Sequence, residues 1–360
     1  MSSSSDRRPL RVVQYGVHDA AYPRNARLRN FLRGRLGASV HVVPRSRAVR
    51  RGRRFGEDVR GLFRASAGAD VIVLSEFRLT HAPLAWLVAR LRGARLVVDH
   101  FVGLHETVVE DHGTVRATSP RARLLALQDR LAARLADVCI TDTEPRAGRL
   151  SRVRKRPVIA LPVGAPVWAR PALEPNRAAT DELRLLFFGN YLPLHGVDFI
   201  VRTLAELAAL RAFTVSFIGN GPTRPDIERM ARMLGIGGRC TFTDPVPEDA
   251  LIDHIHGADI VLGVFGPSRK AREVVPNKVW QALAAGKRCV SGDGPAVRAL
   301  VEVVGDQLVL VDRGDPLAAA RRIDAIADDR VSGGDTHERL ESYTADGYER
   351  LSAALRELAP

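Results

Sequence analysis

The feature that most constrains the fold is a repeated alternation of short apolar runs with amphipathic helical patterns, which starts near the N-terminus and starts again after residue 182. Apolar runs of strand length that alternate with helices favour parallel β-sheets covered by helices. Between the two halves, residues 162–181 contain four prolines and little periodicity, which is typical of a linker. The pattern therefore predicts an α/β chain with two Rossmann-like parallel-sheet domains that face each other across a central cleft.

The linker also sets the expected domain boundaries. At 360 residues the chain is long enough to bury two separate cores. We expect residues 1–168 to form the first domain and residues 182–335 to form the second. The apolar residues from Leu340 to Leu355 predict a terminal helical segment over residues 336–360.

Several elements of the first half are predicted from spacing alone. Leucines at helical spacing predict two amphipathic helices, one with Leu84, Leu87, Val88 and Leu91 and the other with Leu124, Leu127, Leu131 and Leu135. Asn25 is expected to cap an earlier helix. Residues 102–118 are long and unpatterned, which is typical of a lid loop.

The net charge of +13 comes mostly from arginine, since only four of the 54 basic residues are lysines. A dense cluster comprises Arg45, Arg47, Arg50, Arg51, Arg53, Arg54, Arg60 and Arg64. Such a cluster favours an anionic membrane surface, a lipid-phosphate acceptor or nucleic acid, and a solvated loop explains it equally well. Nucleic acid is the least favoured partner, because aromatic residues make up only 6% of the chain and no binding module is recognisable.

The sequence also bears on location and cofactors. It shows no apolar signal core at the N-terminus and no run of about 18 apolar residues. Three widely spaced cysteines without a C-x-x-C pair predict reduced thiols, and no D-x-D motif or His/Asp/Glu spacing indicates a metal. Arg224 stands where the dinucleotide fingerprint needs its third glycine. We therefore expect a cytoplasmic protein without metal or cofactor, located at the inner face of the membrane if the arginine cluster binds lipid.

The most informative stretch is residues 258–295. An apolar strand over residues 260–264 leads through a basic loop to Pro276, and residues 277–285 predict a short helix that ends at Gly286. The first turn of a helix attracts anions, because its N–H groups are unpaired and the helix dipole is positive there. The cations near this end are Arg269, Lys270, Arg272 and Lys278. One acid, Glu273, stands among them, eight residues before Gln281 and expected on roughly the same face.

Glu273, Gln281 and the following Ala282-Leu283-Ala284-Ala285-Gly286 resemble the E-x7-E donor-binding signature of retaining glycosyltransferases of family 4, or glycosyltransferase group 1. The resemblance is strongest over residues 183–295. It implies the GT-B fold, with an acceptor-side first domain, a donor-binding second domain and a terminal segment packed back on the first. In that family the first acid binds the sugar hydroxyls and the second binds the ribose. Gln281 departs from the pattern, because an amide offers one carbonyl where a carboxylate offers two acceptor oxygens.

The resemblance implies transfer of a sugar, with retention, from a nucleotide diphosphate sugar to a glycan, a lipid-linked sugar or a small metabolite. The expected donor-binding residues are Gly189, Asn190, His195, Gly219, Asn220, Lys270, Arg272, Asn277, Lys278 and Gln281. The expected catalytic residues are Asp99 and His100, at the end of an apolar strand, and Glu273. The expected acceptor-side residues are Gly16, Asp19, Tyr22 and Arg24, in a loop that a plain turn explains equally well.

Two other interpretations stay open. His195 stands where the family usually has lysine, and Gln281 replaces an acid, so the chain is alternatively a donor-binding subunit without catalysis. The third interpretation is a basic nucleic-acid-binding protein, which the net charge alone supports.

Overall fold

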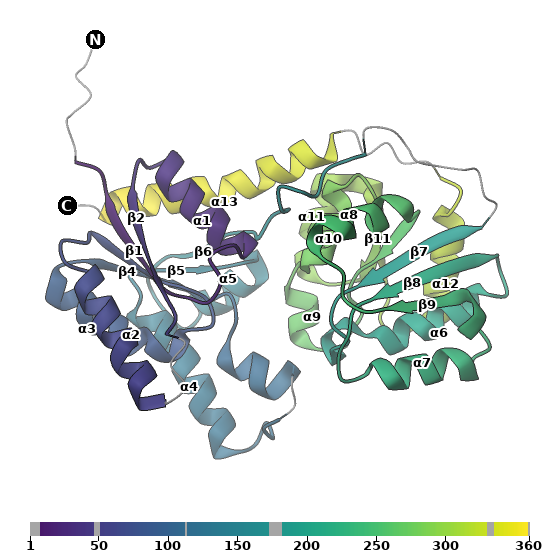
Figure 1. The fold of residues 1–360 in the computed structure, drawn as a ribbon, viewed down its shortest axis with the longest axis horizontal. Helices are drawn as coiled ribbons and strands as arrows, with labels where there is room; N and C mark the ends of the chain where they lie inside the picture. The colour runs from purple at the N-terminus through teal and green to yellow at the C-terminus, as the bar shows by residue number, and fades with distance from the viewer. Residues whose placement is uncertain (1–7, 47–50, 112–113, 173–181, 330–334, 359–360) are drawn as a thin grey trace, which may run out of the picture. The chain divides into compact units, whose positions relative to one another are not determined.

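The chain folds into two compact units, each built on one parallel β-sheet (Figure 1). The computed structural model describes residues 8–46, 51–111, 114–172, 182–329 and 335–358. The first unit comprises residues 1–109, 113–163 and 345–360, and the second comprises residues 110–112 and 164–344. The predicted fold of two Rossmann-like parallel-sheet domains is confirmed.

The sheet of the first unit has six parallel strands in the order β2-β1-β3-β4-β5-β6. These strands are β1 (Arg11–Val17), β2 (Ser39–Pro44), β3 (Val71–Leu74), β4 (Arg95–Asp99), β5 (Val138–Thr141) and β6 (Val158–Ala160). The strand order reverses between β1 and β3. Loops at the carboxyl ends of these two strands therefore diverge and leave room for a ligand.

Helices cover both faces of this sheet. They are α1 (Pro23–Gly34), α2 (Arg51–Ala65), α3 (Ala82–Arg92), α4 (Pro120–Leu135) and α5 (Glu144–Ser151), with short turns η1 (Leu79–His81) and η2 (Glu106–Asp111). One core lies between the sheet and α2 to α5, and the opposite core includes α1. Tyr348, Leu351 and Leu355 of α13 (Thr336–Leu358) join that opposite core. The end of the chain thus packs on the first unit.

The second sheet also has six parallel strands, in the order β12-β11-β10-β7-β8-β9. The strands are β7 (Leu183–Phe188), β8 (Phe213–Ile218), β9 (Cys240–Thr243), β10 (Ile260–Leu262), β11 (Arg288–Gly292) and β12 (Leu308–Val311). The helices are α6 (Val197–Leu207), α7 (Arg224–Met233), α8 (Glu248–Gly257), α9 (Arg269–Glu273), α10 (Asn277–Ala284), α11 (Pro295–Val304) and α12 (Pro316–Ile326), with turns η3 (Pro193–His195), η4 (Gly237–Arg239) and η5 (Gly305–Gln307). The order reverses between β7 and β10, so the corresponding ligand edge lies beyond these two strands.

Two helices of the first unit bury a different face from the one that leucine spacing suggests. Helix α3 buries Ala82, Ala85, Val88 and Ala89, and α4 buries Ala122, Ala132 and Ala133. Leu87 and Leu91 on α3 are 49% and 67% exposed, and Leu124, Leu127 and Leu131 on α4 are 54%, 56% and 40% exposed. Both predicted helices are present. Their inner faces differ from the leucine stripe because small alanines let these helices approach their neighbours closely, which leaves the larger leucines outside.

Three further expectations need correction. Helix α1 begins at Pro23 with Tyr22 as its N-cap residue, so Asn25 lies inside the first turn and does not cap it. Residues 102–118 include the helical turn η2, where Glu106 accepts hydrogen bonds from Arg146 at 2.7 Å and Arg149 at 2.5 Å. The arginine cluster lies largely on α2 instead of in a loop, and Arg47 and Arg50 lie outside the described residues.

Candidate functional site

The best-formed site of the second unit lies at the carboxyl edge of its sheet, where β7 and β10 diverge. Strand β7 runs directly into Gly189 and Asn190, and the neighbouring β8 runs into Gly219 and Asn220. Both glycines have positive φ values, of 128° and 135°. A Cβ atom on Gly219 would lie 2.1 Å from the carbonyl oxygen of Gly189, so only glycine permits this contact between the two turns.

Asparagine side chains and backbone groups complete this pair of turns. The carbonyl of Asn220 accepts a hydrogen bond from the backbone N–H of Tyr191 at 3.1 Å, and its side-chain oxygen accepts one from Gly221 at 2.7 Å. Arg224, at the position where a dinucleotide fingerprint needs glycine, donates to the carbonyl of Gly219 at 3.0 Å. The predicted residues Gly189, Asn190, Gly219 and Asn220 are therefore together in one backbone platform.

Lys278 lies beside this platform and is the most unusual charged group of the unit. Its side chain is 5% exposed, and its Nζ atom has no hydrogen-bond partner among the described residues. The Nζ atom lies 3.9 Å from the centre of the Phe187 ring, and a Cβ atom on Gly189 would lie 3.3 Å from it. Burial lowers the pKa of Lys278 to about 7. A buried ammonium with an aromatic ring as its main neighbour is incomplete without an anion.

The position of Lys278 on its helix strengthens this conclusion. Helix α10 begins at Asn277, so Lys278 occupies its second position. The positive end of the helix dipole disfavours a cation there and favours an anion. Lys278 and the first turn of α10 therefore present positive charge to the same space beside Gly189, as an anion site requires.

His195 closes the site from the loop between β7 and α6. Its Nδ1 atom is hydrogen-bonded to the carbonyl of Asn190, and burial together with the nearby Lys278 charge lowers its pKa to about 3. His195 is therefore neutral at pH 7 and adds no positive charge. Its own carbonyl accepts a hydrogen bond from Phe265 at 3.0 Å, which ties this loop to the segment after β10.

Arg313 is the residue of this region that the sequence reasoning missed. It follows β12 and donates five hydrogen bonds to backbone carbonyls, those of Val264, Gly266, Ala271, Gly292 and Asp293, at 2.7 to 3.1 Å. One guanidinium thus holds together the segment after β10, helix α9 and the turn after β11. A charged residue near the carboxyl end of an apolar strand was the available signal, and it was used for Asp99 but not here.

Helix α9 replaces the expected basic loop and carries Lys270, Arg272 and Glu273. Its N-cap Ser268 accepts a hydrogen bond from Ala271 at 3.2 Å, and Val274 to Pro276 separate it from α10. Glu273 and Gln281 therefore lie on different helices, and the expectation that they share one helix face was wrong because of this break. Gln281 does lie one turn after Lys278 on α10, where residues three apart are neighbours.

In the first unit, Arg24 and Asp99 form one buried ion pair. Asp99 accepts two hydrogen bonds from the Arg24 guanidinium, at 2.7 and 2.9 Å, and both side chains are about 1% exposed. Arg24 also donates to the carbonyl of Leu161 at 2.7 Å and lies over the Phe101 ring at 4.7 Å. The structure thus pairs Arg24, expected on the acceptor side, with Asp99, expected to be catalytic. Both of these roles stay predictions.

His100, the second predicted catalytic residue of this unit, is also buried. Its Nε2 atom is 3.2 Å from the carbonyl of Asp129, and its Nδ1 atom has no partner among the described residues. Burial and the charge of Arg146 lower its pKa to about 4, so it is neutral at pH 7. Its predicted approach to the transferred sugar stays a prediction.

The loop after β1 meets the loop after β3 at the reversal point of the first sheet. His18 contacts Phe77 edge to face, with ring centres 4.9 Å apart, and its ring centre lies 5.5 Å from that of Tyr22. Glu76, fully buried and not foreseen from the sequence, accepts hydrogen bonds from Asn25 at 2.6 Å and is paired with His18 at 2.9 Å. Burial raises the pKa of Glu76.

The remaining predicted residues of this loop have local contacts. Gly16 lies within β1 with φ 79°, and a Cβ atom there would be 2.8 Å from the Arg78 side chain. Asp19 accepts a hydrogen bond from Ala21 at 2.8 Å, which is the plain turn that the sequence allowed. Phe77 has φ 61°, a strained value for a non-glycine residue, and its ring is 42% exposed.

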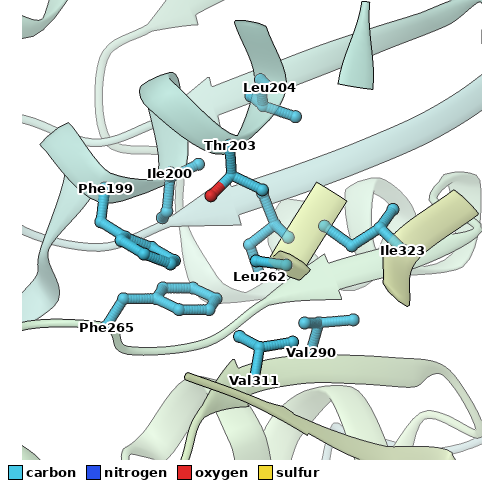
Figure 2. Close-up of a pocket in the computed structure, with 10 residues that line it drawn as sticks. Phe199, Ile200, Thr203, Leu204, Leu262, Phe265, Val290, Val311 and Ile323 are labelled. Carbon is cyan, nitrogen blue, oxygen red and sulfur yellow. The ribbon is translucent and has the colours of Figure 1, made fainter. Parts of the chain in front are cut away.

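Neither the apolar cavity of the second unit nor the acidic and metal-ligating side chains in the described part of the chain offer a second site. Figure 2 shows an apolar cavity of about 10 Å³ between α6 and the sheet, where Phe199 and Phe265 stack with ring centres 5.4 Å apart. Thr203 is the one polar residue that lines it, so the cavity suits neither a nucleotide nor a stably bound water. Among the residues that the structure describes, no group of three or more His, Cys, Asp or Glu side chains is arranged to hold a metal ion.

Comparison with known proteins identifies the second unit. Residues 182–329 match the family described as glycosyl transferases group 1. Over these residues the chain is similar to group 1 glycosyltransferases. The D-inositol 3-phosphate glycosyltransferase of Mycolicibacterium smegmatis is 28% identical over 164 residues, 42% of this chain and 38% of that protein. The D-inositol 3-phosphate glycosyltransferase 2 of Catenulispora acidiphila is 33% identical over 150 residues, 39% of this chain and 34% of that protein. The matches thus span well under half the length of these curated relatives.

Solved structures extend the likeness to the whole chain. Sucrose-phosphate synthase from Thermosynechococcus elongatus has a TM-score of 0.72 at 16% identity, over 97% of this chain and 99% of that one. HepE of Anabaena, solved in complex with UDP, has a TM-score of 0.62 at 13% identity, over 97% and 98% of the two chains. At these identities the likeness shows the fold, which is GT-B.

Proposed function

We propose that this chain is a glycosyltransferase that moves a sugar from a nucleotide diphosphate sugar to an acceptor, with the donor bound at the carboxyl edge of the second sheet. The observation that carries the proposal is Lys278, a buried ammonium without a hydrogen-bond partner, at the positive end of α10 and against the glycine turn after β7. HepE, which shares the fold, binds UDP, so UDP-sugars are the first donors to test.

The chemistry follows from where charge develops. As the glycosidic bond breaks, the departing nucleoside diphosphate gains negative charge, and a preorganised positive site stabilises that state more than the ground state. Lys278 and the first turn of α10 supply such a site. The backbone platform of Gly189 and Gly219 lets phosphate oxygens approach closely, because no side chain stands in the way.

The other predicted groups complete the proposal. Glu273 would orient hydroxyls of the transferred sugar, and Gln281, one turn from Lys278, would hold the ribose. Because Lys278 and the helix dipole balance the diphosphate charge, we propose that the reaction needs no divalent cation. Retention at the anomeric carbon is part of the proposal on family grounds. EDTA should leave the rate unchanged, and NMR of the first-formed product should show the donor's anomeric configuration.

We propose that the acceptor binds to the first unit at the reversal point between β1 and β3. His18, Tyr22 and Phe77 offer aromatic faces, and Arg24 and Asp99 fix the loop and strand end beside them. Aromatic faces suit a sugar ring, whether it is part of a glycan, a lipid-linked sugar or a small metabolite. We place the reaction in the cytoplasm, where the free thiols of the chain would stay reduced.

The test measures binding and turnover separately. The protein is titrated with UDP-, GDP-, ADP- and dTDP-sugars by calorimetry, and release of the nucleoside diphosphate is followed with a panel of acceptors that includes D-inositol 3-phosphate. Lys278→Met should bind the donor far more weakly than the wild type does. Lys287→Met, which removes a lysine beyond the opposite end of the same helix, should bind normally.

Three outcomes separate the alternatives. Binding with turnover that Glu273→Gln removes supports the enzyme. Tight binding without turnover for any acceptor supports a donor-binding subunit that lacks catalysis. Absence of binding for every nucleotide sugar contradicts the proposal, and so does equal binding by the Lys278 and Lys287 variants.

A further inference from the structure

The outer surface of α3 and α4 in the first unit is unusual because large apolar side chains lie on it. Five leucines of these two adjacent helices are 40% to 67% exposed: Leu87, Leu91, Leu124, Leu127 and Leu131. Single exposed leucines are common, but five on two helices in contact with each other are a concentration of apolar side chains that usually marks a site of contact. We call these five residues the leucine surface.

Arginines flank the leucine surface, and acids are missing from it. On α4, Leu124, Leu127 and Leu131 recur at spacings of three and four, and Arg123, Arg130 and Arg134 lie beside that stripe. Asp129 is the one acid of the two helices, and the backbone N–H groups of Leu104 and His105 donate to it at 2.8 and 2.9 Å. The outward side of α3 and α4 therefore presents leucine and arginine side chains and no free carboxylate.

A basic hollow adjoins one end of the leucine surface. It has a volume of about 500 Å³, and its lining includes Trp86, Arg90, Arg134, Arg154, Lys155 and Arg156. Asp137 compensates part of this charge by pairing with Arg90 at 2.9 Å and Arg156 at 2.6 Å. Arg134 is exposed and donates to the backbone carbonyl of Val153, so its positive charge stays available to an anion. Arg154 is buried and donates to the carbonyls of Ala136 and Asp137.

We infer that the leucine surface and the basic hollow together dock the first unit on a bilayer of anionic phospholipid. Leucines beside arginines, with a tryptophan at the edge, are the composition by which a helix lies in the lipid interface. The leucines enter the acyl boundary, and the cations of the hollow receive lipid phosphates. Among the helices that the structure describes, none has the length and hydrophobicity to cross a bilayer, so this contact is peripheral.

The charges and apolar side chains of the leucine surface disfavour two other binding partners. A second copy of the chain would place arginines opposite arginines, and like charges at an interface are repelled. Nucleic acid would satisfy the arginines but leave the leucines against a hydrated phosphate backbone. The arginine cluster of α2 is a different surface, whose exposed large apolar side chains are Phe55 and Phe63.

The test is sedimentation of the whole chain with vesicles. Vesicles of phosphatidylglycerol in phosphatidylcholine are compared with vesicles of phosphatidylcholine alone. Leu127→Ser/Leu131→Ser should lower the partition coefficient on the anionic vesicles by on the order of tenfold or more, since two leucines no longer enter the lipid. The matched control is Leu234→Ser/Leu317→Ser, whose leucines are 43% and 40% exposed in the second unit, and it should bind as the wild type does.

A second pair of variants tests the charge. Arg123→Gln/Arg130→Gln should weaken binding to anionic vesicles and reduce its dependence on salt, whereas Arg321→Gln/Arg322→Gln on α12 should not. All four variants should keep the wild-type donor affinity, so this result does not depend on the proposed reaction. The inference is overturned if the wild type ignores anionic vesicles or if both leucine pairs bind alike. It is also overturned if light scattering shows that the leucine change converts a dimer into a monomer.

Discussion

Replacing Lys278 by methionine should stabilise the free protein and strongly weaken its binding of donor. Burial lowers the pKa of Lys278 from 10.5 to about 7, so the unfolded chain binds more protons than the folded chain between these two values. The free energy of unfolding contributed by this residue therefore rises with pH from about 7 to 10.5. At pH 7 the desolvation cost is on the order of 4 kcal/mol.

Contact with Phe187 offsets part of that cost. A cation over an aromatic ring in a desolvated site gains about 1–2 kcal/mol. Lys278→Met keeps a side chain of similar length and removes the charge, so we expect the free energy of unfolding to rise by about 2–3 kcal/mol at pH 7. Urea denaturation at pH 7 and pH 9.5 measures it, and the gain should be smaller at the higher pH.

The affinity for donor should fall as the pH rises, whereas the free energy of unfolding contributed by Lys278 rises with pH. Nucleotide-sugar phosphates carry fixed charge from pH 6 to 9, so the pH dependence of binding reports on the protein. Because only protonated Lys278 attracts the diphosphate, the wild-type Kd should rise roughly tenfold per pH unit above pH 7. Lys278→Met should bind weakly at every pH. A variant that is less stable than the wild type, or a wild-type Kd that is flat from pH 6 to 9, would refute the reasoning.

Three other substitutions test the surrounding structure by urea denaturation. Arg313→Met should lower the free energy of unfolding by about 3 kcal/mol and weaken donor binding. Arg313→Lys should show the same loss of stability and of donor binding, because an ammonium has three donors for five carbonyls. Thr203→Val should raise the free energy of unfolding by about 1 kcal/mol, because the buried hydroxyl has no hydrogen-bond partner in its apolar surroundings. Arg24→Met should lower it by about 3–5 kcal/mol by leaving Asp99 buried and unpaired.

Controls and contrary results are specific to each substitution. Arg35→Met breaks an exposed pair with Glu349 and should change the free energy of unfolding by less than about 1 kcal/mol. An Arg24 variant that is no less stable than this control would show that the Asp99 pair is not a buried charge pair. Full donor affinity in Arg313→Met would remove Arg313 from the support of the site. A less stable Thr203→Val would show that the hydroxyl has a partner.

The sequence predicted the second unit better than the first for a physical reason. In α6, Phe199, Ile200, Leu204 and Leu207 are large, regularly spaced and all buried, so spacing alone located the helix and its inner face. In α3 the inner face consists mainly of alanine, and the leucines that spacing detects point outward. Apolar periodicity finds a helix in both cases, but it identifies the buried face only where large residues carry the packing.

The sequence grouped the cations of the candidate donor site, but it did not indicate which of them is buried. Four cations near the start of α10 looked equivalent in the sequence, and burial distinguishes Lys278, which is 5% exposed, from Arg272, which is exposed. Arg313 was missed because its partners are backbone carbonyls, which carry no residue-specific signal. Helix α9 was also missed, since its residues were expected to form a basic loop, whereas the start of α10 after Pro276 was predicted.

The most direct test of the central claim is the number of protons that the protein takes up when donor binds. The heat of binding of the tightest nucleotide sugar at pH 8, measured in buffers with different ionisation enthalpies, gives that number. With a pKa of about 7 in the free protein, Lys278 is mostly neutral at pH 8 and should become charged against the diphosphate. The account predicts uptake of close to one proton by the wild type, and no uptake in the weak binding that remains in Lys278→Met. Wild-type binding without proton uptake would contradict it.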